Sequence, residues 1–246
     1  MGHSLPILGV PGVLGGGASV PFVPTDIASL AFWAKADAGV YTDAAKATPA
    51  TNGQLVYTWV DQKGGADLVQ ATEGNRPTFN TNQINGLPAL TFAGTHFMNS
   101  TFDLNNGYTA VYVLFTTDGT TNKYACSSSA VYNNYIYVLA NRSVRLNAGT
   151  TVFPFPSGSY PLSTTVCAYV TYAGANTNIE LNGIAGTPGD AGTTALTNLR
   201  VGAQAGGTEG WIGQTAEVLY FSEVLSAPNK AALYAYISAR YGITFP

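Results

Sequence analysis

The chain has 246 residues, of which 46% are hydrophobic and only 9% are charged, and its formal net charge is -3 at pH 7. Soluble domains usually carry about 25% charged residues, so the surface of this one must consist mainly of Thr, Asn, Ser, Gly and Tyr. Ten Lys and Arg residues provide too little positive charge to follow a phosphate backbone, which argues against nucleic acid as a partner.

Residues 1–24 contain no Asp, Glu, Lys or Arg. No charged region precedes the apolar residues, and Pro6, Pro11 and the glycines 15–17 interrupt them, so neither a signal peptide nor a membrane span is expected. We predict an extended arm that docks on other subunits, because 24 extended residues reach about 80 Å. The predicted anchoring side chains are Leu5, Ile7, Leu8, Val10, Val13, Leu14, Val20 and Phe22.

The remainder, residues 25–246, is predicted to be one all-β domain, because short runs of β-branched and aromatic residues alternate with turn residues. The strongest run is 108–116, which contains no strand breaker and suits a central strand. Asn182 and Gly183 favour a tight hairpin after 178–181, since both tolerate a positive φ. The other expected strands are 135–140, 143–147, 165–172, 199–202 and 212–222.

One α-helix is predicted at the C-terminal end of the chain, over residues 227–241. Ser226 suits the N-cap, Pro228 suits the first turn, and Gly242 suits the position that ends the helix. Apolar residues at helical spacing predict a stripe that packs on a sheet.

Cysteine and histidine are scarce, which limits redox and metal chemistry. Cys126 and Cys167 can be bonded only if two facing strands bring them together, and the lack of a secretion signal favours free thiols. His3 and His96 are the only histidines, and His96 suits a turn. We expect no metal, no cofactor and no catalytic residue.

Several motifs, in their order and spacing, resemble laminin-G-like domains of the concanavalin A-like superfamily. They are LAFWAKAD at 30–37, WVDQKGG at 59–65, GLPALTFAG at 86–94, NIELNG at 178–183, LRVG at 199–202, WIG at 211–213, EVLYF at 217–221 and ARYGI at 239–243. The resemblance implies a two-sheet antiparallel jelly-roll sandwich with one C-terminal α-helix. It implies no single activity, because this fold serves lectins, glycan hydrolases, adhesion modules and virion components.

Hydrolases of this superfamily place two acidic residues at alternate positions of one strand, so that both project from one face. The acids of this chain are dispersed, and Glu180 and Glu217 each stand alone in a predicted strand. The sequence therefore predicts a protein that is not an enzyme, although acids distant in sequence can still meet in space.

A glycan site is predicted in the loop Tyr132, Asn133, Asn134 and Tyr135, which combines aromatic rings with amide groups. Most other aromatic residues suit core or half-buried positions, including Trp33, Trp59 and Trp211.

Together these observations predict a structural protein of a tailed bacteriophage, placed on the virion surface as a capsid decoration, head-fibre or tail-fibre component. The expected partners are other virion proteins, further copies of the chain in a homo-oligomer, and a host-surface glycan. The alternative is a free carbohydrate-binding module or lectin, and a glycosidase is the third hypothesis.

Overall fold

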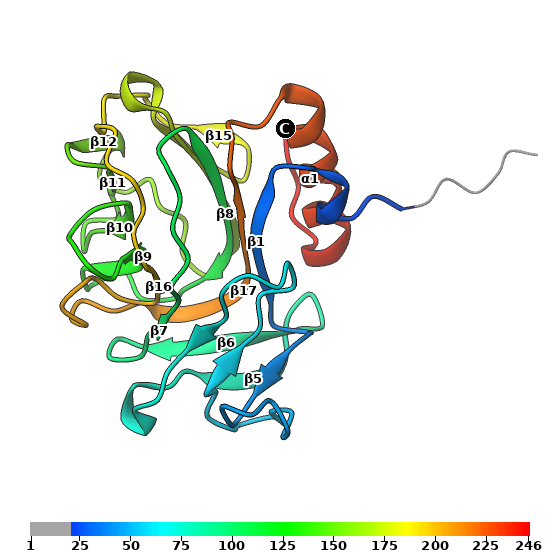
Figure 1. The fold of residues 1–246 in the computed structure, drawn as a ribbon. Helices are drawn as coiled ribbons and strands as arrows, with labels where there is room; N and C mark the ends of the chain where they lie inside the picture. The colour runs from blue at the N-terminus through cyan, green and yellow to red at the C-terminus, as the bar shows by residue number, and fades with distance from the viewer. Residues whose placement is uncertain (1–20) are drawn as a thin grey trace, which may run out of the picture.

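Strands dominate residues 21–246, which are the part of the chain that the computed structural model describes (Figure 1). They form two sheets, and every pairing between the named strands of residues 21–246 is antiparallel. Short 3-10 turns stand at Pro24–Asp26, Glu73–Asn75 and Gly174–Asn176.

The first sheet, sheet A, has eight strands in the order β15-β14-β13-β8-β17-β6-β5, with β1 paired to β17. At its centre β8 lies between β13 and β17, and its burial on both sides explains a strand made almost entirely of apolar residues. The strands are β1 (Leu30–Lys35), β5 (Thr78–Ile84), β6 (Leu87–Ala93), β8 (Tyr108–Phe115), β13 (Thr165–Tyr172), β14 (Asn178–Leu181), β15 (Ile184–Ala185) and β17 (Ile212–Phe221).

The second sheet, sheet B, has nine strands in the order β12-β11-β10-β9-β16-β7-β4-β3-β2. Its strands are shorter, and four of them contain only two residues. They are β2 (Val40–Tyr41), β3 (Thr58–Trp59), β4 (Leu68–Val69), β7 (Met98–Asn99), β9 (Lys123–Ser128), β10 (Tyr135–Val138), β11 (Val144–Asn147), β12 (Thr151–Phe155) and β16 (Leu199–Val201).

The main hydrophobic core lies between the two sheets. Tyr112 and Leu114 of β8 project into it from sheet A, while Ile136 of β10 and Leu146 of β11 project from sheet B. Because strand side chains alternate between faces, the neighbouring residues point away from this core. The outer face of each sheet is therefore set by the residues in between.

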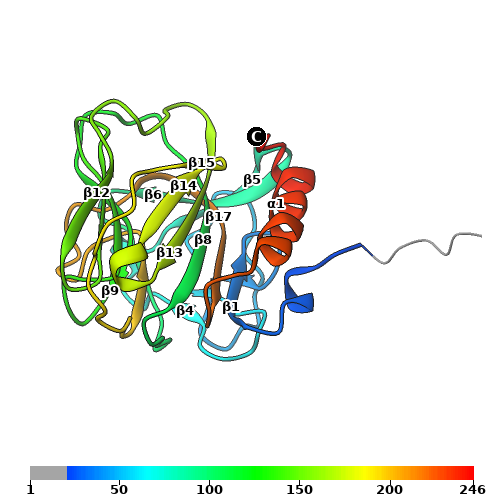
Figure 2. The ribbon, with the colours of Figure 1, turned by 90° about the horizontal axis from the view of Figure 1, so that it is seen from above.

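A single α-helix, α1 (Ala227–Tyr241), covers the outer face of sheet A (Figure 2). Val111 and Val113 of β8 pack with Leu233 and Ile237 of the helix in a second hydrophobic cluster. The layers thus run from sheet B through sheet A to α1. No helix of residues 21–246 is both long and apolar enough to pass through a bilayer.

The structure confirms the predicted two-sheet antiparallel sandwich with one C-terminal helix. The Ser226 side chain accepts a hydrogen bond from Asn229 N, and Gly242 ends the helix at φ 67°. Asn182 and Gly183 have the positive φ values of the predicted hairpin, 50° and 81°. The two cysteines are free, and they lie in different hydrophobic clusters.

Of the predicted arm, only its last four residues belong to the described part of the chain. Phe22 is half-buried, and its ring packs edge-on against Tyr236 of α1, with 6.3 Å between the ring centroids. Pro24 is buried at the start of a 3-10 turn. The other predicted anchor residues, Leu5, Ile7, Leu8, Val10, Val13, Leu14 and Val20, lie outside the described residues, and their role stays a prediction.

Candidate functional site

The outer face of sheet A uses its carboxylates to hold α1. Glu217 is fully buried beneath the helix, where Oε1 accepts hydrogen bonds from Trp33 Nε1 (2.5 Å) and the Tyr236 hydroxyl (2.9 Å). Its other oxygen accepts a hydrogen bond from the Tyr241 hydroxyl at 2.7 Å. Glu180 pairs with Lys230 of the helix in the same way. Both strand glutamates are therefore used to hold α1 against sheet A.

The outer face of sheet B instead carries a group of tyrosine rings. Tyr135 and Tyr137 of β10 share this face because they are two residues apart, and Tyr124 of the neighbouring β9 lies against both. The rings of Tyr124 and Tyr137 are stacked with centroids 4.0 Å apart, while Tyr124 meets Tyr135 edge-on at 5.1 Å. We call these three residues the tyrosine cluster.

An arginine and a phenylalanine cover one side of the tyrosine cluster. Arg145 of β11 is directly opposite Tyr137 in the strand register. Its guanidinium carbon lies 4.6 Å from the ring centroid of Phe153 and 5.7 Å from that of Tyr137. The Phe153 side chain, from edge strand β12, is 55% exposed. Cation–π attraction holds the guanidinium and leaves its terminal N–H groups without a partner among the described residues.

Glu209 lies at another side of the cluster, on the loop between β16 and β17. Its Oε1 atom accepts hydrogen bonds from the Tyr137 hydroxyl at 3.1 Å and from Asn122 Nδ2 at 3.4 Å. The Glu209 side chain remains exposed to solvent. A guanidinium and a carboxylate therefore flank the same tyrosine.

The hydroxyls of Tyr124 and Tyr137 remain protonated at neutral pH. Burial, followed by the hydrogen bond to Glu209, raises the pKa of Tyr137 to about 12. Burial also raises the pKa of Tyr124 above its usual range. These hydroxyls are hydrogen-bond donors and acceptors, and they are poor nucleophiles.

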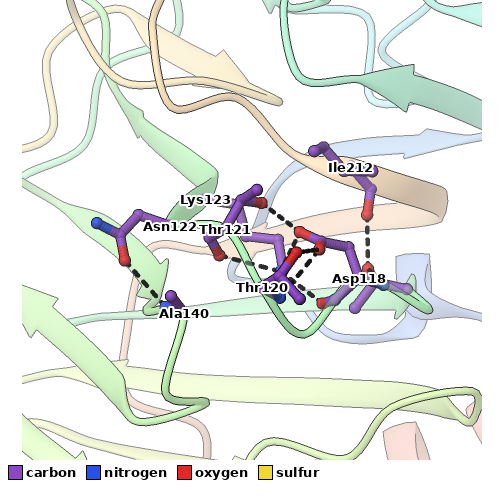
Figure 3. A network of polar contacts seen from close by, with 8 residues as sticks. Asp118, Thr120, Thr121, Asn122, Lys123, Ala140 and Ile212 are labelled. Carbon is purple, nitrogen blue, oxygen red and sulfur yellow. Dashed lines mark hydrogen bonds and ion pairs between the residues drawn. The ribbon is translucent and has the colours of Figure 1, made fainter.

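A polar network at the β8–β9 turn positions the strand that carries Tyr124 (Figure 3). The Lys123 ammonium is buried and donates to the Asp118 carboxylate at 2.8 Å and to the Asp118 carbonyl at 2.6 Å. Thr120 and Thr121 also donate to the Asp118 carboxylate. Asn122, next in the chain, accepts from Ala140 N at 2.9 Å and thereby ties this turn to the β10–β11 turn. These bonds hold the turn before β9 and the turn after β10, the two strands that carry the tyrosine cluster.

The pKa of Asp118 reflects this network. Burial of the carboxyl acts to raise its pKa, but the hydrogen bonds from Lys123, Thr121 and Thr120 outweigh burial and hold the pKa well below its usual range. Asp118 is therefore ionised throughout the neutral range, which keeps Lys123 paired.

The fold can be compared with that of known proteins. No family model and no curated protein matches this chain. Among solved structures, it is similar to the Trypanosoma rangeli sialidase, with TM-score 0.57 and 15% identity over 88% of this chain and 35% of that chain. It is also similar to a mutant GH54 α-L-arabinofuranosidase soaked with 4-nitrophenyl α-L-arabinofuranoside, with TM-score 0.54 and 16% identity over 76% of this chain and 51% of that chain.

These similarities show a shared fold. The chain spans about a third of the length of the sialidase and about half of the arabinofuranosidase. Both of those proteins are enzymes by name, but identities of 15% and 16% do not carry an activity to this chain.

The predicted glycan loop lies next to the cluster, and its four residues differ in exposure. Tyr132 is 60% exposed, and its hydroxyl lies close to Gly206. Asn133 and Asn134 are buried; Asn134 Nδ2 donates to the Tyr108 hydroxyl at 3.1 Å and to the Thr194 carbonyl at 3.0 Å. Tyr135 belongs to the tyrosine cluster. The structure thus leaves Tyr132 and the Tyr135 neighbourhood as surfaces for a ligand, and their glycan binding stays a prediction.

A shallow groove of about 400 Å³ lies farther along sheet B. Arg200 connects it to the loop at 204–207, since its Nε donates to Asn99 Oδ1 at 2.7 Å and its Nη1 donates to the Gln204 carbonyl at 2.7 Å. The groove is lined by Asp67, Val69, Asn99, Ser100, Thr101, Ser129 and Asn198. Its amide and hydroxyl groups extend the polar surface beyond the tyrosine cluster.

Sequence reasoning found Tyr135 but missed Tyr124, Tyr137, Arg145, Phe153 and Glu209. One signal was present, because Tyr135 and Tyr137 alternate in a predicted strand and the next predicted strand places Arg145 opposite Tyr137. Glu209 gave no signal, since its loop reaches the site only through the long-range β16–β9 pairing. Among residues 21–246, no group of three or more His, Cys, Asp or Glu gathers in a way that suits a metal ion.

Proposed function

We propose that this chain is a non-catalytic glycan-binding domain displayed on a virion, and that the outer face of sheet B contacts the host glycan. The observation that carries the glycan proposal is the exposed Phe153 ring beside the tyrosine cluster, with Arg145 and Glu209 on either side. Binding sites typically combine an apolar or aromatic surface with a few fixed polar groups. A sugar ring has the matching chemistry, with an apolar face and hydroxyls at its rim.

The contrast between the two sheets supports the choice of face. Helix α1 buries the outer face of sheet A, and the polar groups there already have partners within the chain. Sheet B keeps exposed aromatic side chains at Phe153 and Tyr132. Exposed large aromatic side chains on an otherwise polar surface are typical of recognition sites.

The chemistry at the cluster supports binding without catalysis. A glycosidase of the common kind needs two carboxyl groups, about 5–5.5 Å or 6.5–9.5 Å apart. Among the residues that the structure describes, Glu209 is the only carboxylate hydrogen-bonded to the tyrosine cluster.

The virion assignment rests on the sequence. Residues 1–24 are free of charged side chains and rich in Leu, Ile and Val, which suits anchoring to other virion proteins or to further copies of the chain. Residues 21–24 are the part of this segment that the structure describes. A free lectin with the same sheet B site is the alternative.

A glycan array tests the binding proposal with the full chain. We expect saturable binding to a subset of glycans, and we expect Phe153→Ala to weaken it about tenfold or more, since aromatic anchors dominate such interfaces. Ile184→Ala is the matched control, because Ile184 is 63% exposed on β15, the edge strand of the other sheet. Absence of glycan binding, or equal loss in both variants, would contradict the proposal.

A further inference from the structure

Arg145 differs from most arginines of this chain in lacking an acceptor. Arg240 pairs with Asp37, Arg76 donates to the carbonyls of Gln70 and Ala71, and Arg200 donates to carbonyls of its own loop. Arg145 forms no ion pair with any carboxylate of residues 21–246, and its Nε atom is buried without a hydrogen-bond partner. The Nε atom is shielded from a ligand, but the two terminal nitrogens also have no partner among the described residues and are not shielded in this way, so they can receive an acceptor from outside the chain.

The guanidinium is nevertheless held in place. Its stacking against Phe153 and Tyr137 restricts the side chain, and the strand pairing opposite Tyr137 fixes its backbone. An arginine that is already oriented loses little entropy when it binds, and its planar fork matches the two oxygens of a carboxylate. These properties suit an anionic group of a ligand.

Glu209 limits which anionic ligands can bind at Arg145. It lies on the other side of Tyr137 and would repel a ligand of high negative charge. A single carboxylate placed on Arg145 is compatible with it, provided that the ligand also has hydroxyl groups to donate to Glu209 and Tyr137. A sugar with one carboxylate has both features, whereas a simple anion lacks the donors.

On this basis, and resting on the proposed function, we propose that the sheet B site selects acidic glycans, with the sugar carboxylate bound by Arg145, sugar hydroxyls bound by Glu209, and the sugar ring against Phe153. Arg145 is then the residue that determines specificity. Phe153 supplies contact area that neutral and acidic sugars share.

The test compares acidic glycans with their methyl esters, which keep the ring and remove the charge. The full chain is titrated with trigalacturonic acid, with glucuronic-acid-terminated and sialic-acid-terminated oligosaccharides, and with the methyl ester of each. At least one acid should bind about tenfold to a hundredfold more tightly than its ester, because a hydrogen bond to a charged group contributes about 1.5–3 kcal/mol.

Arg145→Gln should abolish that preference, because the acid loses its guanidinium partner, and should weaken binding of the acid far more than binding of its ester. Arg145→Lys keeps the charge without the planar fork and should restore part of the preference. Arg142→Gln is the matched control, because Arg142 lies in the turn just before β11 and also forms no ion pair with a carboxylate of the described chain, yet does not stack on these rings. Urea unfolding of each variant establishes that it is folded.

The outcomes separate the two proposals. Equal affinity for acids and esters, or an equal effect of Arg145→Gln and Arg142→Gln, overturns the acidic-glycan inference while leaving a Phe153-dependent glycan site intact. Binding of neutral glycans and not of acidic ones also overturns the acidic-glycan inference and leaves the Phe153-dependent glycan site intact. Failure of every glycan to bind, on the array and in these titrations, overturns the proposed function and the inference together.

Discussion

At the scale of single residues, the buried side chains Lys123 and Glu217 are matched by partners, one close in the sequence and the other distant. Lys123 and Asp118 pair within one turn, whereas Glu217 receives hydrogen bonds from β1 and from α1. A buried charge that loses its partner is far more destabilising than the pair is stabilising. The loss of unfolding free energy caused by a conservative substitution at one of these positions therefore measures how much the pairing stabilises the fold.

Asp118→Asn removes the carboxylate partner of the buried Lys123 ammonium. We expect the free energy of unfolding at pH 7 to fall by about 3–5 kcal/mol, because an unpaired buried charge remains. Urea unfolding measures the loss. Glu73→Gln, which removes one exposed negative charge, is the control and should have little effect; equal losses would contradict the assigned role of the pair.

The same pair predicts acid sensitivity. The folded-state pKa of Asp118 lies below its unfolded value of 3.8, so its contribution to stability is present above that value and is lost as the pH falls below it. Unfolding free energies of the wild type should therefore decline more steeply below about pH 4 than those of Asp118→Asn. Parallel pH profiles would show that another group governs the acid transition.

The contribution of Glu217 to the free energy of unfolding should change with pH in the opposite direction to that of Asp118. Burial raises its pKa, outweighing the hydrogen bonds from Tyr241 and Trp33, so its contribution is largest below the unfolded value of 4.5 and declines as the pH rises through the folded-state pKa. Glu217→Gln should remove that decline while keeping the shape. Glu217→Ala should destabilise by on the order of 3 kcal/mol, because three donors lose their acceptor. Urea unfolding across pH 4 to 8 distinguishes these results.

At the scale of elements, α1 is the clearest case in which local signals and tertiary packing agree. Its N-cap, its buried stripe of Leu233 and Ile237, and its glycine stop were all readable from the sequence. The glycine stop also serves packing, because Asn85 Nδ2 donates to the Arg240 carbonyl at 2.8 Å beside it. The end of the helix is thus fixed from two sides.

Gly242→Ala should lower the free energy of unfolding by about 1–2 kcal/mol, because Gly242 has φ 67° and residues with a side chain adopt that conformation at a cost. Gly74→Ala is the control, since an added Cβ there meets nothing within 4 Å and its φ is not positive. Thermal unfolding of the two variants and the wild type provides the comparison. Equal midpoints for all three proteins would contradict the argument.

Elements with strong local patterns were predictable, and elements made by long-range pairing were not. The strands at 165–172 and 178–181 and the helix were predicted with their observed bounds. The strand β9 was missed because KYACSS lacks the β-branched pattern, and β12 because it contains Pro154, which edge strands tolerate. Two-residue strands such as β3 and β4 exist only through their neighbours in sheet B.

The candidate site shows the same limit. Tyr135 was predicted because aromatic and amide residues adjoin it, but composition alone did not reveal that Asn134 turns inward. Asn134 adopts φ 51° and its amide bonds to Tyr108 and Thr194, which are distant in sequence. Arg145 and Phe153 meet Tyr137 only once β10, β11 and β12 are paired in register.

At the scale of the whole molecule, the described fold is built from residues 21–246 in three layers. A chain that lacks residues 1–20 should therefore still fold into this sandwich, which urea unfolding would establish. Removing residues 1–24 should lower the urea midpoint, because it also removes Phe22, which packs on Tyr236, and the buried Pro24. If the chain is a virion component as proposed, both truncations should lose incorporation into virions. Incorporation of a truncated chain would contradict the predicted anchoring role.

The placement of Phe22 against α1 has a consequence for copies held side by side. The described chain begins on the side of α1, and β9 and β12 of sheet B lie on the other side of sheet A (Figure 2). The tyrosine cluster belongs to sheet B. Copies attached through the segment before Pro21 would all present their sheet B faces in one direction. If each copy binds a glycan as proposed, several weak contacts would combine into avidity for a repetitive polysaccharide.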